Sequence, residues 1–89
     1  MVNRQQKAFF RGMDLRESFA ANLRRLRHEK GLSQEDLAYT ADINRTYISK
    51  LEKGISHPGL EIIGKLAAVL GVEPSELLKT PPKKQTRKK

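Results

Sequence analysis

The sequence predicts an all-α fold, built as one compact domain of five short helices. Three observations lead to this prediction. Between residues 14 and 78, nineteen Leu, Ile, Val or Phe residues recur at helical spacing, and no stretch shows the alternation typical of a strand. Ser, Asn, Gly and Pro stand where such helices would begin and end. A chain of 89 residues also has room for only one small domain.

The first helix is expected over residues 15–30. Its apolar residues recur at steps of four, four and three, which places them on one face: Leu15, Phe19, Leu23 and Leu26. Gly31 follows where a left-handed residue commonly ends a helix.

The start of the second helix, expected over residues 34–40, has the clearest local signal in the chain. Ser33 can cap the helix, and Asp36 three residues later can complete a capping box. Leu32 and Leu37 occupy the positions of a hydrophobic staple around the same start. Two independent features therefore predict one starting residue.

Three more helices follow the same rules, over residues 45–53, 60–70 and 74–78. Asn44 can cap the third helix, which ends before Gly54. Gly71 is placed to end the fourth, and Pro74 lies in the first turn of the fifth.

The formal net charge of +8 belongs to the two ends of the chain. Residues 1–13 carry +3 and residues 79–89 carry +6, whereas residues 14–78 carry −1. We expect residues 1–13 to be a flexible basic leader, within which Met13 is a possible start, and residues 79–89 to be a disordered basic arm. The arm is either a solubilising tail or a contact for an anionic polymer.

Composition also excludes several classes of protein. The absence of Cys excludes a disulfide scaffold, a thiol nucleophile and a Cys-based zinc site. The two histidines, His28 and His57, show no metal-ligand spacing, and no phosphate-binding loop or paired nucleophile and base is present. The longest apolar run, residues 66–70, is too short to span a bilayer, and no secretory signal is visible. We therefore expect a cytoplasmic protein that is not an enzyme, with no cofactor, metal, membrane or small-molecule partner.

The outward face of the third helix is the candidate binding surface. At about 100° per residue, Ile48 and Leu51 fall on one side of the helix. The opposite arc carries three bases, two hydroxyls and no acid: Arg45, Thr46, Ser49, Lys50 and Lys53. Such a mixture suits the major groove of DNA, where bases contact phosphates and guanine edges. The alternative is an ordinary solvated face of an amphipathic helix.

Several motifs resemble one family. Residues 32–38 (LSQEDLA) and 47–54 (YISKLEKG) are similar to the helix-turn-helix of phage-repressor-like DNA-binding proteins of the Cro/C1, or xenobiotic-response-element, type. Residues 66–72 (LAAVLGV) and 74–78 (PSELL) extend the resemblance over residues 15–78. The small stand-alone layout is similar to that of controller proteins of restriction–modification systems.

The resemblance implies a lambda-repressor-like fold and a transcriptional regulator, repressor or controller, that binds a partly palindromic site on double-stranded DNA as a homodimer. It implies base contacts from Arg45, Thr46 and Lys50, and contacts to phosphates or the groove edge from the other candidates. The full set of candidate DNA-binding residues is Ser33, Gln34, Asn44, Arg45, Thr46, Ser49, Lys50, Lys53, Ser56 and His57. It also implies a structural ion pair between Arg27 and Glu52, each of which flanks the apolar stripe of its own helix.

Two residues depart from the family pattern. Asp42 stands in the turn where Gly is common, and Gly59 stands where Ser or Thr usually caps the fourth helix. Asp tolerates the left-handed region better than most residues, so we expect the turn to be kept.

The last two helices are the expected dimer contact. Their apolar residues exceed what a small core would absorb, and the candidates are Ile62, Val69, Val72, Leu77 and Leu78. The alternative function is a protein-interaction module on the same fold, such as an antitoxin or a coactivator bridging factor.

Overall fold

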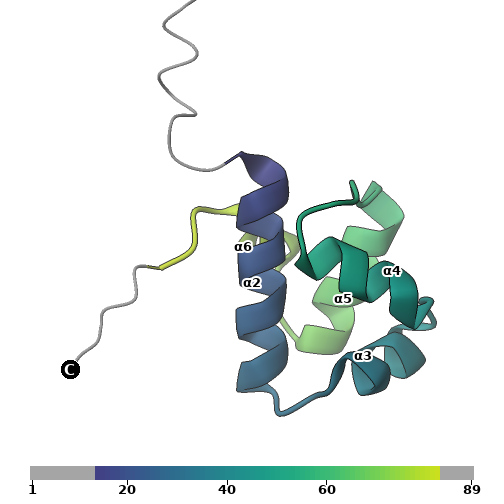
Figure 1. Cartoon of the computed structure of the whole chain (residues 1–89). Coiled ribbons are helices and arrows are strands. Elements are labelled where there is room, and N and C mark those ends of the chain that lie inside the picture. The colour runs from purple at the N-terminus through teal and green to yellow at the C-terminus, as the bar shows by residue number, and fades with distance from the viewer. Residues whose placement is uncertain (1–13, 83–89) are drawn as a thin grey trace, which may run out of the picture.

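The computed structural model describes residues 14–82. In this part of the chain there are five helices and no strand, in the order α2 (Leu15–Glu29), α3 (Gln34–Ala41), α4 (Arg45–Glu52), α5 (Leu60–Leu70) and α6 (Pro74–Leu78) (Figure 1). The all-α prediction is confirmed, and the observed ends differ from the expected ones by at most one residue. The leader expected at residues 1–13 and residues 83–89 of the expected arm lie outside the described residues.

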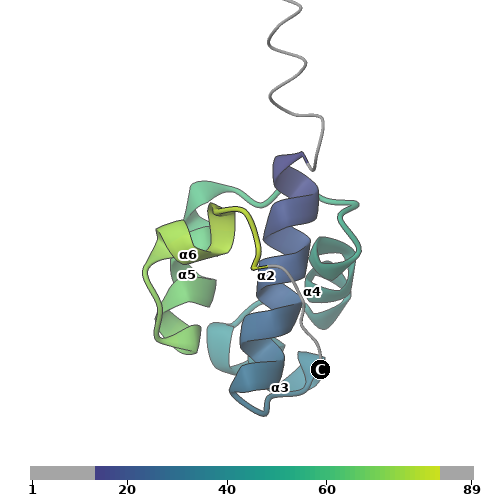
Figure 2. The same ribbon diagram turned by 90° about the vertical axis from the view of Figure 1, so that its left-hand side faces the viewer.

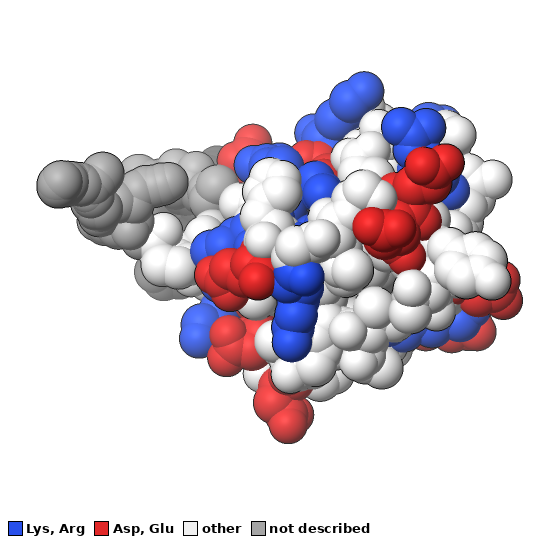
Figure 3. Space-filling model, turned by 90° about the horizontal axis from the view of Figure 1, so that it is seen from below, with Lys and Arg blue, Asp and Glu red and all other residues white. Residues whose placement is uncertain are grey.

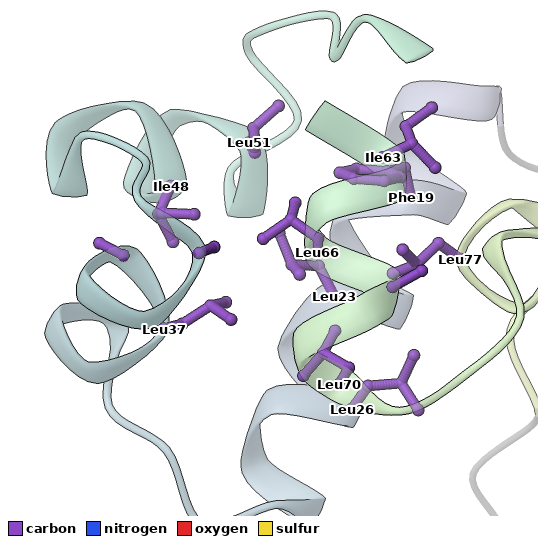
Figure 4. Close-up of a cluster of buried hydrophobic side chains, with 13 residues drawn as sticks. Phe19, Leu23, Leu26, Leu37, Ile48, Leu51, Ile63, Leu66, Leu70 and Leu77 are labelled. Atoms are coloured by element: carbon purple, nitrogen blue, oxygen red, sulfur yellow. The ribbon is translucent and has the colours of Figure 1, made fainter. Parts of the chain in front are cut away.

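The helices enclose one apolar core. Helix α2 packs against α4 and α6, α3 packs against α4 and α5, and α5 packs against α6. Each helix sends its apolar stripe inward, so that side chains distant in sequence meet at the centre (Figure 4). The residues that are fully buried there include Phe19, Leu23, Leu37, Ile48, Leu51, Leu66, Leu70 and Leu77.

The burial of Leu77 corrects one part of the predicted dimer contact. This side chain is 0% exposed and belongs to the core, so it cannot contact a second copy of the folded domain. A five-residue helix at the end of the domain has to bury its one inward side chain to stay attached. Ile62, Val69 and Val72 are half-buried against the core, and Leu78 remains 37% exposed.

The polar side chain of Asn22 lies fully buried inside the domain. Asn22 is 0% exposed, and its amide nitrogen donates to the carbonyl oxygens of Leu77 at 3.0 Å and Lys79 at 2.8 Å. Its amide oxygen accepts from Arg25 Nη2 at 3.1 Å. These bonds satisfy the buried amide and attach the end of α6 to α2.

Residues 79–82 belong to the expected basic arm, and the structure places Pro81 and Pro82 beside α2. Figure 2 shows this segment leaving α6 and ending in front of the near edge of α2, and Figure 1 shows it on the side of α2 away from α4. Pro81 and Pro82 line a hollow of about 280 Å³ together with side chains of the outer face of α2. The bond from Asn22 to the Lys79 carbonyl holds the beginning of the segment in place.

The folded part is electrically balanced. Residues 14–82 contain ten Lys or Arg and ten Asp or Glu. The face seen from below in Figure 3 shows both signs of charge interleaved over its surface. None of the helices between residues 14 and 82 has the length and apolar character needed to cross a membrane.

Candidate nucleic-acid interface

The start of α3 is built by the capping box that the sequence predicts. Ser33 Oγ accepts from the Asp36 amide at 2.9 Å, and Asp36 Oδ2 accepts from the Ser33 amide at 3.1 Å. Both bonds satisfy amides that a helix start leaves without an intrahelical partner. The cap fixes where α3 begins and leaves Ser33 exposed at its N-terminus.

Asp42 makes the turn between α3 and α4. Its φ of 59° and ψ of 51° place it in the left-handed region, and it is the only non-Gly residue between 14 and 82 with positive φ. The amide of Ile43 then donates to the carbonyl of Ala38 at 2.9 Å, which closes the end of α3. The turn is therefore kept with Asp in place of Gly, as expected.

Helix α4 begins at a capped residue and presents a basic face. Asn44 Oδ1 accepts from the amides of Thr46 at 2.8 Å and Tyr47 at 3.4 Å, so its side chain is engaged in the cap. Ile48, Leu51 and Glu52 are buried on the inner side. On the outer side, Arg45, Thr46, Lys50 and Lys53 are exposed and Ser49 is half-buried. Because the only acid of the helix points inward, the outward face of α4 carries no negative side chain.

A buried ion pair holds α4 against α2. Arg27 Nε donates to Glu52 Oε2 at 2.6 Å, and Arg27 Nη2 donates to Glu52 Oε1 at 2.9 Å. Arg27 Nη1 also donates to the carbonyl of Leu32 at 2.9 Å, just before α3. The hydrogen bond with Glu52 raises the pKa of Arg27 above its ordinary value, and charge attraction adds to this, against the opposing effect of burial. The predicted pair is present and joins three elements.

Gln34 is bound to the same carboxylate. Its Nε2 donates to Glu52 Oε1 at 3.0 Å, and the side chain is half-buried. The first residue of α3 is thus tied to the last residue of α4, which fixes the spacing of the two helices of the motif.

The loop after α4 is tied back to that helix. Tyr47 Oη donates to the carbonyl of His57 at 3.2 Å. His57 is exposed and Ser56 is half-buried, and the bond from Tyr47 holds the His57 backbone beside α4.

The candidate residues therefore fall into two groups. Ser33, Gln34 and Asn44 hold the helix-turn-helix together through their side chains. Within residues 14–82, the outward side chains of α4 make no hydrogen bond or ion pair with the rest of the domain. Sequence reasoning missed Tyr47, and it missed Arg24, whose Nη1 donates to the carbonyl of Glu52 at the end of α4. It also missed Asn22, although an Asn between Phe19 and Leu26 on an apolar stripe is a signal of a buried polar contact. Across the described residues, no three His, Cys, Asp or Glu side chains gather in a way that would hold a metal ion.

Two short helices joined by a tight left-handed turn, with the second helix exposing a basic face, define a helix-turn-helix domain of the DNA-binding kind. The chain belongs to the helix-turn-helix family, whose pattern matches residues 23–77.

Known proteins with similar sequence and structure are regulators. The control protein C.BamHI of Bacillus amyloliquefaciens is 41% identical over 66 residues, which cover 73% of this chain and 82% of that protein. The hypothetical transcription factor NHTF from Neisseria, whose crystal structure is known, has 44% sequence identity to this chain. Its structure superposes with a TM-score of 0.74, and the match covers 76% of this chain and 78% of that one. The restriction–modification controller protein C.AhdI from Aeromonas hydrophila is also 44% identical, with a TM-score of 0.68 over 70% of this chain and 94% of that one. The predicted resemblance to controller proteins is confirmed.

Proposed function

We propose that this protein is a sequence-specific regulator of transcription, of the controller or repressor kind, that binds a partly palindromic site on double-stranded DNA as a homodimer. Membership of the helix-turn-helix family and the likeness to a control protein and a controller structure support a DNA-binding regulator. The observation that carries the proposal is the acid-free outward face of α4 in a domain whose charges balance as a whole.

The exposed residues of α4 and the start of α3 would make different contacts with the DNA. The outward residues Arg45, Thr46 and Lys50 would read base edges in the major groove, with Arg45 able to make a bidentate contact to guanine. Ser49 and Lys53 would contact the groove edge or phosphates. Ser33, with the free amides at the start of α3, would lie against a phosphate, because a helix N-terminus favours an anion.

The residues that brace the interface act indirectly. Gln34, through its bond to Glu52, and Asn44, through the helix cap, would set the position of α4. The hydrogen bond from Tyr47 would hold Ser56 and His57 near the backbone of the DNA. Contacts of this kind position the protein, whereas base contacts determine which sequence it prefers.

A dimer would use the α5–α6 side. Leu78 at 37% exposure and Leu60 at 87% exposure leave apolar surface there, next to the half-buried Ile62, Val69 and Val72. Two-fold pairing would place two copies of α4 about 34 Å apart, which matches one turn of DNA. Sedimentation at micromolar concentration is expected to show a dimer, and only monomer with or without DNA contradicts this part of the proposal.

Selection of bound duplexes from a random pool tests the function directly. We expect a short motif with partial two-fold symmetry, and binding that weakens steeply with salt. Enrichment of no motif, with binding equal on all duplexes, contradicts sequence-specific recognition. Failure to bind any duplex would instead favour a protein-interaction module on the same fold. The proposed location is the cytoplasm of a bacterial cell.

A further inference from the structure

Helix α2 holds the end of helix α4 at two points. The two helices lie side by side (Figure 2), and the carboxylate of Glu52, the last residue of α4, is paired with Arg27 of α2. A second arginine of α2, Arg24, donates from Nη1 to the backbone carbonyl of the same Glu52. Because Arg24 and Arg27 are three residues apart on α2, they are neighbours on one face of that helix. The side chain and the backbone of Glu52 are therefore held separately.

The Glu52 carbonyl lies in the last turn of α4, where a helix leaves its carbonyls without intrahelical donors. The amides of residues 53–55 bond to the carbonyls of residues 49–51. The Glu52 carbonyl accepts from Arg24, and the dipole of α4 also favours a cation at this end of the helix. Arg24 thus caps α4 from another helix.

The surroundings of Arg24 bring the residues after α4 against α2. Arg24 lines a hollow of about 210 Å³, and the residues that share it come from both segments: Glu17, Ala20, Lys53 and Gly54. Gly54 approaches the backbone of α2, since a Cβ added to it would lie 3.9 Å from the carbonyl oxygen of Arg16. The end of α4 is therefore seated along α2, and Arg24 lies within that contact.

The two ends of α4 are held by different helices. At its start, Asn44 caps the first turn, and the amide of the preceding Ile43 donates to the carbonyl of Ala38 in α3. At its end, the bond from Arg27 reaches a carboxylate that several rotatable bonds separate from the helix axis. The bond from Arg24 reaches the backbone itself. It is therefore the bond that most directly fixes the direction of α4 relative to α2.

A small change in that direction matters for the residues near the end of α4. Eight residues of α-helix are about 12 Å long, so a tilt of about 5° around the start of α4 moves its end by about 1 Å. A shift of that size is enough to lengthen a hydrogen bond beyond its useful range. It would displace Lys50, which lies near the end of α4, and leave Arg45 at the start nearly in place.

We propose that Arg24 is a positioning residue for DNA recognition, which sets the angle of α4 in the major groove by holding its last carbonyl. This inference rests on the proposed function, in which α4 faces the DNA. Arg24 itself contacts no base. Its effect is on the choice of sequence, because base contacts determine specificity whereas contacts with phosphates supply the general attraction to DNA.

The ratio of two affinities tests this role. Arg24→Met removes the donors and keeps an unbranched apolar stem. Affinities are measured for the selected duplex and for a scrambled duplex of the same length and composition. We expect their ratio to fall about five- to tenfold, the lower part of the discrimination that one good base contact provides. An unchanged ratio overturns the inference.

Two further variants separate positioning from folding. A loss of stability alone lowers the folded fraction and therefore weakens binding to both duplexes equally, which leaves the ratio unchanged. Arg24→Lys keeps a cationic donor, and a single carbonyl needs only one donor, so this variant should return the ratio to within about threefold of the original. If Arg24→Met does not fold, as judged by circular dichroism, Arg24→Gln takes its place, because its shorter side chain ends before the carbonyl. A ratio for Arg24→Lys as low as that for Arg24→Met overturns the role of the carbonyl bond.

The neighbouring arginine provides the matched control. Arg25 carries the same charge, and its bonds go to Glu29 at 3.3 Å and Asn22 at 3.1 Å, both within α2. Arg25→Met should therefore leave the ratio of affinities unchanged within about twofold. An equal fall of the ratio in both variants shows that net charge alone acts, and this result overturns the inference.

Salt dependence distinguishes positioning from a direct contact with DNA. The slope of log affinity against log salt should be the same for Arg24→Met and Arg25→Met within about 0.3, whereas loss of one phosphate contact lowers it by about 0.9. A slope lower by that amount for Arg24→Met alone shows that Arg24 binds a phosphate, and it overturns positioning. If the unmodified protein does not distinguish the two duplexes, the proposed function itself is wrong. If it distinguishes them and Arg24→Met does so equally well, only this inference fails.

Discussion

Removing Glu52 should destabilise the domain far more than any surface charge does. Its side chain is 3% exposed, and its two oxygens accept three hydrogen bonds, two from Arg27 and one from Gln34. Glu52→Ala leaves the guanidinium of Arg27 buried without its partner, a loss that typically costs about 3–5 kcal/mol. A domain of this size has a total stability of about 3–10 kcal/mol, so the variant should be partly unfolded at room temperature.

Urea unfolding followed by circular dichroism measures this cost, and a variant that removes both charges assigns it to the unpaired guanidinium. Arg27→Met with Glu52→Leu removes both charges together, and we expect this pair to have a free energy of unfolding equal to that of the original protein or up to about 4 kcal/mol higher. The matched control is Glu29→Ala, which breaks the surface pair with Arg25 at 3.3 Å and should cost at most about 0.5 kcal/mol. The reasoning is refuted if Glu52→Ala costs less than about 1 kcal/mol, or if the double variant is as unstable as the single one.

Three further changes test the interface and its helix ends. Arg45→Ala should weaken the free energy of DNA binding by about 1–3 kcal/mol and relax the preference at one base position. Affinities for the selected site and its point variants measure both effects. Equal losses on specific and random duplexes contradict the prediction that Arg45 reads a base. Gly59→Ser should raise the free energy of unfolding by about 0.5–1 kcal/mol, because Gly59 provides no side-chain cap to α5 and a Cβ there meets nothing within 4 Å. Asp42→Gly should change stability by no more than about 1 kcal/mol, and in the stabilising direction, because it removes an L-residue from a left-handed backbone at φ 59°. A clear decrease in the free energy of unfolding of this variant, measured with urea, would show that the Asp42 side chain makes a stabilising contact.

The sequence by itself determined the helices and the outward face of α4. The start of α3 depends on Ser33 and Asp36, which are three residues apart, and the start of α4 depends on Asn44 and the amides two and three residues later. Interactions of such short range are encoded by spacing alone, because the helix geometry that brings the partners together is itself local. For the same reason the acid-free arc of α4 could be laid out from helical periodicity before any neighbour was known.

Only the tertiary structure decided which side chains are buried and which residues they contact. Leu77 and Leu78 are equally apolar neighbours, yet Leu77 is fully buried and Leu78 is 37% exposed, because α5 and α2 cover only one side of α6. Gln34 lies at a helix start, where the sequence predicts a contact with DNA, and only the tertiary structure shows that its amide also donates to Glu52, 18 residues away. Asn22 finds its carbonyl partners 55 and 57 residues away. The packing of the helices around the core determines which partners meet at such separations. A local sequence pattern cannot predict these partners, because the same spacing of apolar residues is compatible with many helix packings.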